Sequence, residues 1–540
     1  MNSRASRTLK QLLATWQTAV VLLAKRVTTK PYLPQPPAYT GPDVTLIGLT
    51  EKSGEVEPGM GFVARVRAGS DGHPYIGQAI ERGASFILAQ RSSADLGLTI
   101  PEGVVYWQVA DTAVTLAYLS AAWYDFPAHH LTCIGVTGTD GKTSTCRLLF
   151  EMLRAGGLRV GLLSTIKAVI GDSEEPLALH VTTPEAPAVQ RYLRRMVEAG
   201  LTHCVLETTS IGLAQHRVDA IPFQMGIVTN ITHEHLDYHG QYDGYLAAKA
   251  RLFQITAQSG GTAVLNRDDS SYEKLAAIAG TRQISYGLHQ ADVTAGELHY
   301  AADQTRFSLH LPGADPLPIA TPLVGEFNVY NILAAAAAAQ RLDVDKTAVQ
   351  QGIAATTLIS GRMERIDEGQ DFLVVVDFAH TPRALEVAID AGKRMVAARN
   401  GRVITVFGSA GKRDVAKRHL MSEISARDAD ISILTAEDPR TEDLNEILAM
   451  MAQGCERQGG VEEKTFWRIP DRGQAIYQAL SLARPNDLIL ICGKGHEQSM
   501  CFGTVEHPWD DRDATRAALR AFLAGKPMVN LGLPTFSANI

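Results

Sequence analysis

The sequence predicts an α/β protein with several domains and mainly parallel sheets. Its 540 residues exceed what a single hydrophobic core holds, at about 150 residues per domain. Hydrophobic residues make up 45% and charged residues 20% of the chain, which is the ordinary composition of a soluble α/β protein. Short apolar runs alternate with helical patterns along two long regions, and this favours parallel strands joined by crossover helices.

The predicted organisation has five segments. An N-terminal helix with a proline-rich linker (1–42) precedes three α/β domains (43–128, 129–360 and 361–525) and a tail (526–540). The amphipathic stretch at 9–27 is interrupted by Lys10, Gln11 and Gln17, so it predicts neither a membrane-spanning helix nor a signal peptide. We interpret it as a docking or surface helix, with binding to a membrane surface as the alternative.

Each predicted domain rests on its own strand and helix patterns. The first has a strand at 86–88 and a helix at 113–123. The second has apolar runs at 131–136, 160–163, 203–206 and 226–229, and an alanine-rich helix at 331–339. The third has strands at 373–376, 403–407, 431–434 and 488–491, with helices at 383–397 and 444–456. Ligands bind at the carboxyl ends of strands in such sheets, so the polar residues that follow these strands are candidate site residues.

Charge and cysteine usage narrow the possible functions. The formal net charge of −7 gives no indication of a nucleic-acid-binding face, although it is compatible with a local basic pocket for a phosphate-rich ligand. The six cysteines include no Cys-x-x-Cys pair, which is typical of a reducing compartment. We therefore expect a cytoplasmic protein without nucleic-acid partners or stable membrane insertion.

The most informative motif follows the apolar run at 131–136. A glycine-rich loop leads into a helix through Gly138, Thr139, Asp140, Gly141, Lys142, Thr143 and Ser144. Glycines let backbone N–H groups approach phosphate oxygens, the lysine can reach the β- and γ-phosphates, and the threonine hydroxyl can ligate Mg²⁺. The general phosphate-loop pattern requires a glycine where this chain has Val136, so the motif is a variant of that pattern.

Further polar residues follow two other apolar runs. Glu207 comes directly after the run at 203–206, and the segment 230–239 contains His233, His235 and His239. Three histidines with neighbouring acids could hold zinc, but the nearby nucleotide loop favours a single histidine together with Glu207 on Mg²⁺. Lys249 follows on a helix, and its residue chemistry alone predicts a solvated lysine.

These motifs resemble those of the Mur ligase family over roughly residues 45–525. The resemblance implies a three-domain Mur ligase architecture, with a central P-loop ATPase-type parallel sheet and a C-terminal Rossmann-like domain. It implies ATP and Mg²⁺ as cofactors, carbamylation of Lys249, and metal ligation by Thr143, Glu207 and His235. Nucleotide contacts are implied for Asn331, Arg362, Asp377 and His380. The implied catalytic residues are Lys142, Glu207, His235 and Lys249.

Two further blocks resemble the branch of the family that adds the third peptide residue. Gly493 and Glu497 match positions that hold the incoming amino acid, and Arg413 matches an arginine that pairs with its carboxylate. Where diaminopimelate-adding relatives have Asp-Asn-Pro-Arg, residues 437–440 read Glu-Asp-Pro-Arg. Asp438 favours a cationic distal end, as in lysine or ornithine, whereas Arg440 favours a distal carboxylate, so the amino acid stays open.

The resemblance also implies a site for a UDP-N-acetylmuramoyl peptide. Matching positions in the second domain are Thr182, Thr183, Thr209, Gln215 and Arg217. In the first domain Ser53 matches a uridine-side position. The family's usual Asp-Ser-Arg is Lys52-Ser53-Gly54 here, which weakens the expected uridine contact.

The implied reaction is ATP-dependent amide formation. The carboxylate of UDP-N-acetylmuramoyl-L-Ala-D-Glu attacks the γ-phosphate, and a diamino acid (diaminopimelate, lysine or ornithine) then displaces phosphate from the acyl phosphate. We expect a monomer in peptidoglycan precursor synthesis, with closure of the third domain on the second before chemistry. The alternatives are a divergent ligase of the same family acting on another carboxylate, and a nucleotide-binding homologue without catalytic activity.

Overall fold

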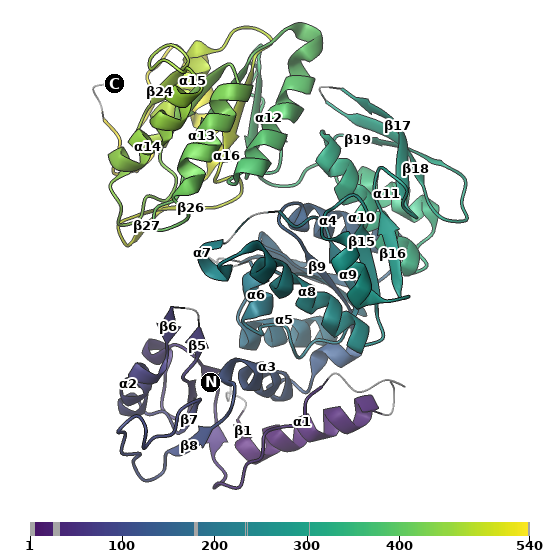
Figure 1. The fold of residues 1–540 in the computed structure, drawn as a ribbon, viewed down its shortest axis with the longest axis vertical. Helices are drawn as coiled ribbons and strands as arrows, with labels where there is room; N and C mark the ends of the chain where they lie inside the picture. Colours follow the sequence, from purple (N-terminus) through teal and green to yellow (C-terminus); the bar gives the residue numbers. More distant parts are fainter. Residues whose placement is uncertain are drawn as a thin grey trace. The chain divides into compact units, whose positions relative to one another are not determined.

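The computed structural model describes residues 6–24, 33–67, 69–177, 182–232, 234, 236–301 and 303–537. The chain divides into two compact units. Figure 1 labels many of the helices and strands named below. The first contains residues 1–231, 243–292 and 334–349, and the second contains residues 232–242, 293–333 and 350–540. Two of the boundaries between the units fall within helices α10 (Glu326–Arg341) and α11 (Lys346–Ala355).

The first unit begins with a four-stranded parallel sheet in the order β3-β4-β7-β8. Helix α1 (Leu9–Ala24) buries Leu9, Leu12 and Trp16 against this region. The indole of Trp16 stacks on Tyr118 of α3 (Thr112–Trp123), with 4.9 Å between ring centroids. The predicted N-terminal helix is therefore present up to Ala24, and residues 25–27 lie outside the described residues. Within the described ranges, no helix is long and apolar enough to cross a membrane.

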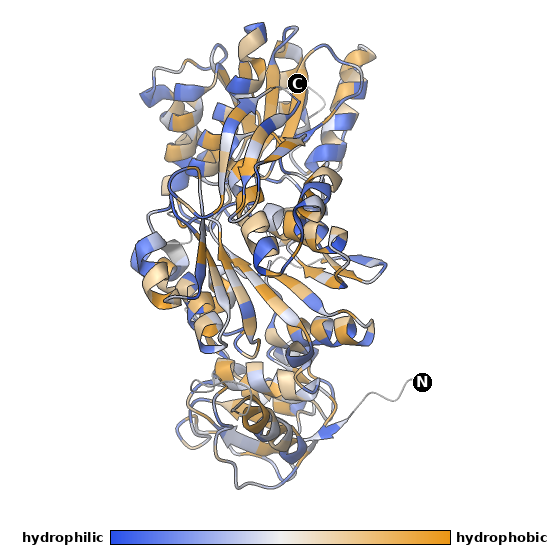
Figure 2. Ribbon diagram, turned by 90° about the vertical axis from the view of Figure 1, so that its right-hand side faces the viewer, coloured by the Kyte–Doolittle hydropathy of each residue, from blue (hydrophilic) through white to orange (hydrophobic). Residues whose placement is uncertain are grey.

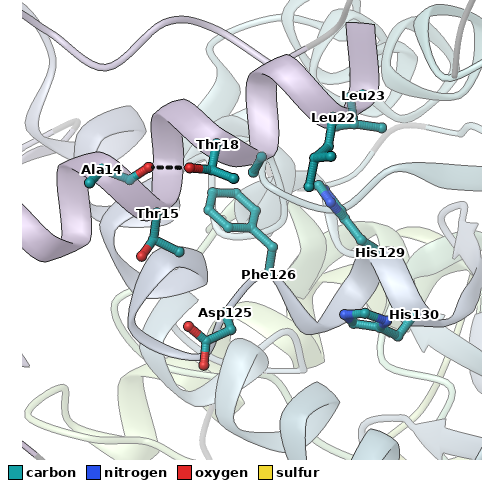
Figure 3. A pocket seen from close by; sticks show the side chains of 10 residues that line it. Ala14, Thr15, Thr18, Leu22, Leu23, Asp125, Phe126, His129 and His130 are labelled. Atoms are coloured by element: carbon teal, nitrogen blue, oxygen red, sulfur yellow. Dashed lines mark hydrogen bonds between the residues drawn. The ribbon is translucent and has the colours of Figure 1, made fainter. Parts of the chain in front are cut away.

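The strands of this sheet are β3 (Leu49–Thr50), β4 (Gly61–Val63), β7 (Phe86–Ala89) and β8 (Val105–Gln108). Shorter elements complete the region: β1 (Arg7–Thr8), β2 (Thr45–Leu46), β5 (Val66–Arg67), β6 (Ser70–Asp71), α2 (Ile76–Glu81) and the 3₁₀ turns η1 (Ser53–Glu55), η2 (His73–Tyr75) and η3 (Pro127–His130). A cavity of about 360 Å³ lies between α1 and the segment 125–130 (Figure 3). Its lining includes Leu22, Phe126 and His129, and none of the predicted site residues belongs to it.

The central sheet of the first unit has eight strands in the order β12-β11-β10-β13-β9-β14-β15-β16. From β10 to β16 every neighbouring pair is parallel, whereas β11 and β12 are antiparallel additions. All four predicted apolar runs are strands of this sheet. The strands are β9 (Thr132–Thr137), β10 (Val160–Leu163), β11 (Lys167–Ile170), β12 (Ser173–Pro176), β13 (His203–Glu207), β14 (Phe223–Val228), β15 (Thr262–Asn266) and β16 (Gln283–Tyr286). The helices are α4 (Lys142–Ala155), α5 (Ala186–Glu198), α6 (Ser210–Ala214), α8 (Tyr242–Gln258) and α9 (Tyr272–Ala279).

The second unit contains a six-stranded sheet in the order β20-β21-β25-β22-β23-β24. All pairs are parallel except β20 with β21. The strands are β20 (Glu364–Arg365), β21 (Leu373–Asp377), β22 (Val403–Phe407), β23 (Ile431–Leu434), β24 (Phe466–Arg468) and β25 (Leu488–Cys492). The helices are α12 (Pro382–Val396), α13 (Ala416–Asp428), α14 (Leu444–Arg457), α15 (Arg472–Leu482), α16 (Asp511–Leu523) and the 3₁₀ turn η4 (Ala397–Arg399). Outside this sheet lie α7 (Leu236–His239), the antiparallel strands β17 (Thr294–Tyr300), β18 (Thr305–His310) and β19 (Leu317–Thr321), and the hairpin β26 (Ser499–Phe502) with β27 (Val505–Pro508).

Alternating residues of these parallel strands fill two separate cores. Val375 and Leu490 belong to one core, whereas Val374 and Ile489 belong to the other. Because helices cover both faces of such a sheet, its strands are apolar on both sides. Figure 2 shows this directly, with hydrophobic strands between helices that carry hydrophilic outer faces. The α/β fold with mainly parallel sheets is therefore confirmed.

Candidate functional site

The glycine-rich loop occupies the turn between β9 and α4. Gly138 has φ of 148° and Gly141 has φ of 82°, which are backbone conformations that favour glycine. A Cβ on Gly138 would lie 1.8 Å from the Thr229 hydroxyl oxygen. The Lys142 ammonium folds over this loop and donates to the carbonyls of Gly138 at 3.0 Å and Thr139 at 2.6 Å. The predicted strand, loop and helix are thus all present, and the lysine lies at the N-terminus of the helix.

Glu207 and Thr143 meet beside this loop. The parallel pairing of β13 with β9 places Glu207 opposite Val136. The Thr143 hydroxyl donates to the Glu207 carboxylate, with its oxygen 3.1 Å from each carboxylate oxygen, and the Thr165 backbone N–H donates to the same group at 3.0 Å. Both side chains are buried. A hydroxyl and a carboxylate form a set of oxygen donors that suits a hard divalent cation such as Mg²⁺.

Lys249 reaches the same loop from helix α8. Its side chain is 1% exposed, so the interpretation as a solvated lysine, based on residue chemistry alone, is wrong. The ammonium donates to the Gly138 carbonyl at 2.5 Å and lies 4.5 Å from the centre of the Tyr245 ring. The Tyr245 hydroxyl in turn lies 3.1 Å from the Thr139 hydroxyl. Residues far apart in the sequence therefore converge on one short loop. His233 and His235 lie outside the described residues.

Four of the predicted peptide-substrate residues form a second cluster in the first unit: Thr183, Thr209, Gln215 and Arg217. The Thr183 hydroxyl donates to the Glu207 carbonyl and lies within hydrogen-bond distance of the Thr209 hydroxyl, each at 3.1 Å. Thr209 also caps helix α6, since its hydroxyl accepts the Gly212 N–H at 3.0 Å. Arg217 donates to the Thr183 carbonyl at 2.5 Å and to the Gln215 side-chain oxygen at 2.7 Å. Thr182 is only partly buried.

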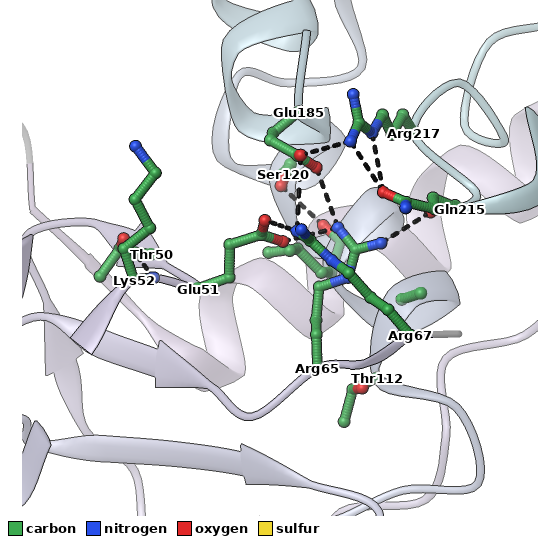
Figure 4. A network of polar contacts seen from close by, with 12 residues as sticks. Thr50, Glu51, Lys52, Arg65, Arg67, Thr112, Ser120, Glu185, Gln215 and Arg217 are labelled. Atoms are coloured by element: carbon green, nitrogen blue, oxygen red, sulfur yellow. Dashed lines mark hydrogen bonds and ion pairs between the residues drawn. The ribbon is translucent and has the colours of Figure 1, made fainter. Parts of the chain in front are cut away.

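This cluster includes two arginines that the sequence reasoning missed. Arg65 pairs with Glu51 at 2.5 Å and with Glu185 at 2.9 Å, and Arg67 pairs with the same two carboxylates. Arg217 joins them through Glu185 at 2.6 Å. Figure 4 shows three guanidinium groups converging on two carboxylates. The alternating arginines in Arg65-Val66-Arg67 were the available signal. Ser53 instead donates to the Gln78 side chain at 2.7 Å.

In the second unit, three of the predicted nucleotide contacts gather around Phe378. The Arg362 guanidinium lies 4.5 Å from the centre of the Phe378 ring, and the His380 ring centre lies 4.4 Å from it. Asp377 accepts the backbone N–H groups of Met363 and Ala379 at 2.7 and 2.8 Å. Burial lowers the pKa of His380, but the Glu234 carboxylate, 3.2 Å from the His380 Nε2, and the negative charge of Glu437 together outweigh it, so the pKa is raised. Asn331 donates to Asn328 at 3.2 Å on α10.

The predicted amino-acid residues lie on loops after β22, β23 and β25. Asp438 accepts hydrogen bonds from the Lys494 ammonium and the Cys501 backbone N–H, both at 2.9 Å. Lys494, which is 2% exposed, also pairs with Glu497. The Arg440 side chain donates to the Gly411 carbonyl at 3.3 Å. Arg413 is exposed, and Gly493 has φ of 117°. The structure thus brings Asp438 and Glu497 together through Lys494, a partner that the sequence reasoning did not identify.

Comparisons with known proteins identify the family to which this sequence is similar. Residues 136–339 match the Mur ligase middle domain, and residues 361–495 match the Mur ligase glutamate ligase domain. The chain is 40% identical to a UDP-N-acetylmuramyl-tripeptide synthetase of Roseiflexus sp. (strain RS-1), covering 89% of this chain and 96% of the relative. It is 37% identical to a UDP-N-acetylmuramoyl-L-alanyl-D-glutamate--2,6-diaminopimelate ligase of Geobacter metallireducens, covering 88% and 94%. A solved structure of a ligase with that second name is 30% identical, with a TM-score of 0.58 over 88% of this chain and 95% of that one.

Proposed function

This chain belongs to the Mur ligase family, and we propose that it is the ATP-dependent ligase that joins a diamino acid to UDP-N-acetylmuramoyl-L-Ala-D-Glu in peptidoglycan precursor synthesis. The observation that carries this proposal is the convergence of Lys142, Thr143, Glu207 and Lys249 on one glycine loop. The names of its relatives, which align over nearly their whole length, support the same substrates.

The proposed reaction has two steps. The terminal carboxylate of the muramoyl dipeptide attacks the γ-phosphorus of ATP, the bond to the bridging oxygen breaks, and ADP leaves. The amine of the amino acid then attacks the carbonyl carbon of the acyl phosphate, inorganic phosphate leaves, and the amine loses a proton. Because the carboxylate and the triphosphate are both anionic, positive charge at the loop is the main requirement. We assign Lys142 to supply that charge.

The oxygen donors of Thr143 and Glu207 would hold Mg²⁺, together with His235, which lies outside the described residues. When bound, the metal supplies positive charge to the phosphate oxygens. We propose that Lys249 is carbamylated: its neutral amine adds to CO₂, an N–C bond forms and a proton is released. The product carries a negative charge in place of the ammonium. The burial of this lysine supports the assignment, because burial in general disfavours a charged ammonium.

The remaining sequence-based assignments stay proposals. Gly138, Thr139, Asp140, Gly141 and Ser144 would bind phosphates with Lys142 and Thr143, while nucleotide contacts would come from Asn331, Arg362, Asp377 and His380. The muramoyl peptide would be held by Ser53, Thr182, Thr183, Thr209, Gln215 and Arg217. The amino acid would be held by Arg413, Asp438, Arg440, Gly493 and Glu497. We also propose that the protein acts in the cytoplasm as a monomer, with the domain boundaries predicted above.

The test measures phosphate release from ATP and Mg²⁺ with UDP-N-acetylmuramoyl-L-Ala-D-Glu, offering diaminopimelate, lysine and ornithine in separate reactions. We expect release with one of them, dependent on both substrates, and its loss in Lys142→Ala. The preferred amino acid would show whether Asp438 or Arg440 dominates selection. Protein that binds ATP but releases no phosphate with any of the three would overturn the proposed substrates. Full activity of Lys142→Ala would overturn the assigned mechanism.

A further inference from the structure

A histidine occupies a backbone position that usually holds glycine at the end of helix α6. His216 has φ of 60°, a left-handed conformation that costs free energy for a residue with a side chain. Its N–H donates to the Leu213 carbonyl at 3.1 Å, and the Arg217 N–H donates to the Gly212 carbonyl at 2.9 Å. These two bonds form the Schellman arrangement, in which the left-handed residue is usually glycine. The imidazole at this position therefore needs a reason beyond the turn itself.

The His216 imidazole contacts a buried carboxylate. Its Nδ1 lies 2.8 Å from Oδ2 of Asp219, whose side chain is 3% exposed. The Arg251 guanidinium donates to both oxygens of the same carboxylate, with its Nε 2.9 Å from Oδ1. Burial by itself raises the pKa of the Asp219 carboxyl, but the hydrogen bonds from His216 and Arg251 outweigh it and lower the pKa. The carboxylate is therefore ionised, and it holds both partners through charge-assisted hydrogen bonds.

On one side, Asp219 fixes the turn that carries two of the proposed substrate residues. Gln215 and Arg217 flank His216 in the sequence, and their side chains are joined by a hydrogen bond of 2.7 Å (Figure 4). Because the backbone at His216 is strained, the turn keeps its shape only while surrounding contacts hold it. The bond from the imidazole to Asp219 is such a contact. It thereby fixes the orientation of the two neighbouring side chains.

On the other side, Asp219 fixes the helix that carries Lys249. Arg251 and Lys249 lie two residues apart on α8. Successive residues of an α-helix differ by about 100°, so these two side chains extend from opposite faces. Lys249 donates to the Gly138 carbonyl of the phosphate loop at 2.5 Å, whereas Arg251 donates to Asp219. The helix is thus held between the loop and the carboxylate.

We propose that Asp219 is a positioning residue of the ligase, which couples the residues that hold the muramoyl peptide to the helix that places Lys249 at the phosphate loop. This inference rests on the proposed function and extends it to a carboxylate that no sequence motif singled out. Asp219 is buried and bonded to His216 and to Arg251, so it acts through these two side chains and touches no substrate. Glycine at position 216 would form the same turn without this link.

The steady-state kinetics of three variants separate the two sides of the coupling. His216→Gly keeps the residue that this turn favours, so the protein should fold, but the KM for UDP-N-acetylmuramoyl-L-Ala-D-Glu should rise about 10-fold with kcat within about two-fold. Arg251→Met should lower kcat about 10-fold with that KM within about two-fold, and Arg251→Lys should recover part of kcat. Asp219→Asn should show both changes. Small displacements of positioned groups are enough for effects of this size.

Asp487→Asn is the matched control for Asp219→Asn. The Asp487 side chain is also 3% exposed, and it pairs with Arg402 at 2.7 Å, but it belongs to none of the proposed sites. This variant should be less stable than wild type while the KM and kcat of its folded fraction are unchanged. Hydrogen exchange of the enzyme without substrates gives a second measurement. Asp219→Asn should exchange faster than wild type both at residues 212–219 and in α8, whereas Asp487→Asn should leave both segments unchanged.

Four outcomes decide the matter. An unchanged KM in His216→Gly, or an unchanged kcat in Arg251→Met, overturns the coupling while leaving the ligase function intact. Equal losses in Asp219→Asn and Asp487→Asn also overturn it, because the carboxylate then contributes to folding alone. Failure of the wild-type enzyme to release phosphate refutes the proposed function itself. The exchange measurement still tests the coupling in that case, and unchanged exchange in either segment of Asp219→Asn overturns it.

Discussion

Replacing Arg472 with methionine should strongly destabilise the second unit. The guanidinium is 0% exposed and donates to both oxygens of Asp511, which is also 0% exposed, at 2.7 Å each. It also donates to the carbonyls of Ala436 at 3.1 Å and Cys492 at 2.7 Å. These carbonyls directly precede Glu437 and Gly493, so one side chain ties together the loops after β23 and β25.

The expected magnitude follows from what the substitution leaves behind. Arg472→Met would strand the Asp511 carboxylate in the core with the Trp509 indole N–H as a remaining donor, 2.9 Å away. Removing one partner of a buried ion pair costs about 3–5 kcal/mol, whereas replacing both partners with apolar groups costs much less. The double variant Arg472→Met with Asp511→Leu should therefore be more stable than the single variant, despite carrying one more substitution.

Hydrogen exchange of the amides in β25, alongside urea unfolding, measures this effect within the second unit. Arg468→Met is the matched control, because its ion pair with Glu462 is over one-third exposed on both sides and such pairs contribute at most about 1 kcal/mol. A single Arg472→Met variant within about 1 kcal/mol of wild type would refute the reasoning. A double variant less stable than the single one would refute it equally.

Three further predictions concern other parts of the chain. Gly138→Ala should abolish ATP-dependent phosphate release while the protein stays folded by circular dichroism, because the new methyl group would collide with the Thr229 hydroxyl; retained activity would contradict the loop geometry. Trp16→Ala should lower the free energy of unfolding, measured by thermal unfolding, by about 3–5 kcal/mol, because a fully buried aromatic side chain is lost. Trp16→Phe should keep most of this stability, because the new ring can still stack on Tyr118. Asp487 is buried, which by itself raises its pKa, but hydrogen bonds from Arg402 and Arg484 lower it overall. Its ionised form should therefore stabilise the protein above the unfolded pKa of about 3.9 and lose that contribution as pH falls through the lower folded value. In urea unfolding from pH 6 to pH 3 the advantage of wild type over Asp487→Asn should shrink, and a constant difference would contradict this.

The strands were predictable because a sheet covered on both faces requires uninterrupted apolar residues. The apolar runs at 160–163 and 488–491 predict buried strands, and they lie in β10 and β25. The loop after β9 was predictable for a related reason, since glycines and a lysine between a strand and a helix have few structural uses. Such patterns predict the local backbone conformation and the burial of side chains, and both properties depend mainly on short stretches of sequence.

Partners across the fold were not predictable in the same way. Lys249 is flanked by alanines, and its local sequence predicts a solvent-exposed side chain. Its position on α8 instead brings the ammonium to the Gly138 carbonyl, more than 100 residues away in the sequence. Glu437 and Lys494 lie in different loops, and only the strand order β25-β22-β23 brings those loops to one edge. Arg65 and Arg67 could be read as a basic strand, but nothing local indicates that Glu185 will neutralise them. Long-range pairing depends on topology, which a single sequence specifies only indirectly.

The departure of the loop from the general phosphate-loop pattern has a structural reason. Val136, where that pattern requires glycine, is a fully buried residue of β9, paired with Glu207 on one side and Ile227 on the other. Glycine is needed where the backbone has a positive φ, and a strand residue such as Val136 does not need one. An apolar side chain at this position packs into the core instead. The chain turns only at Gly138, whose carbonyl accepts both the Lys142 and the Lys249 ammonium groups. In this variant β9 continues through Val136 and Thr137, so the loop begins at Gly138. The glycine that the general pattern has at position 136 is therefore needed at position 138 instead, where the carbonyl of one residue accepts hydrogen bonds from two lysines.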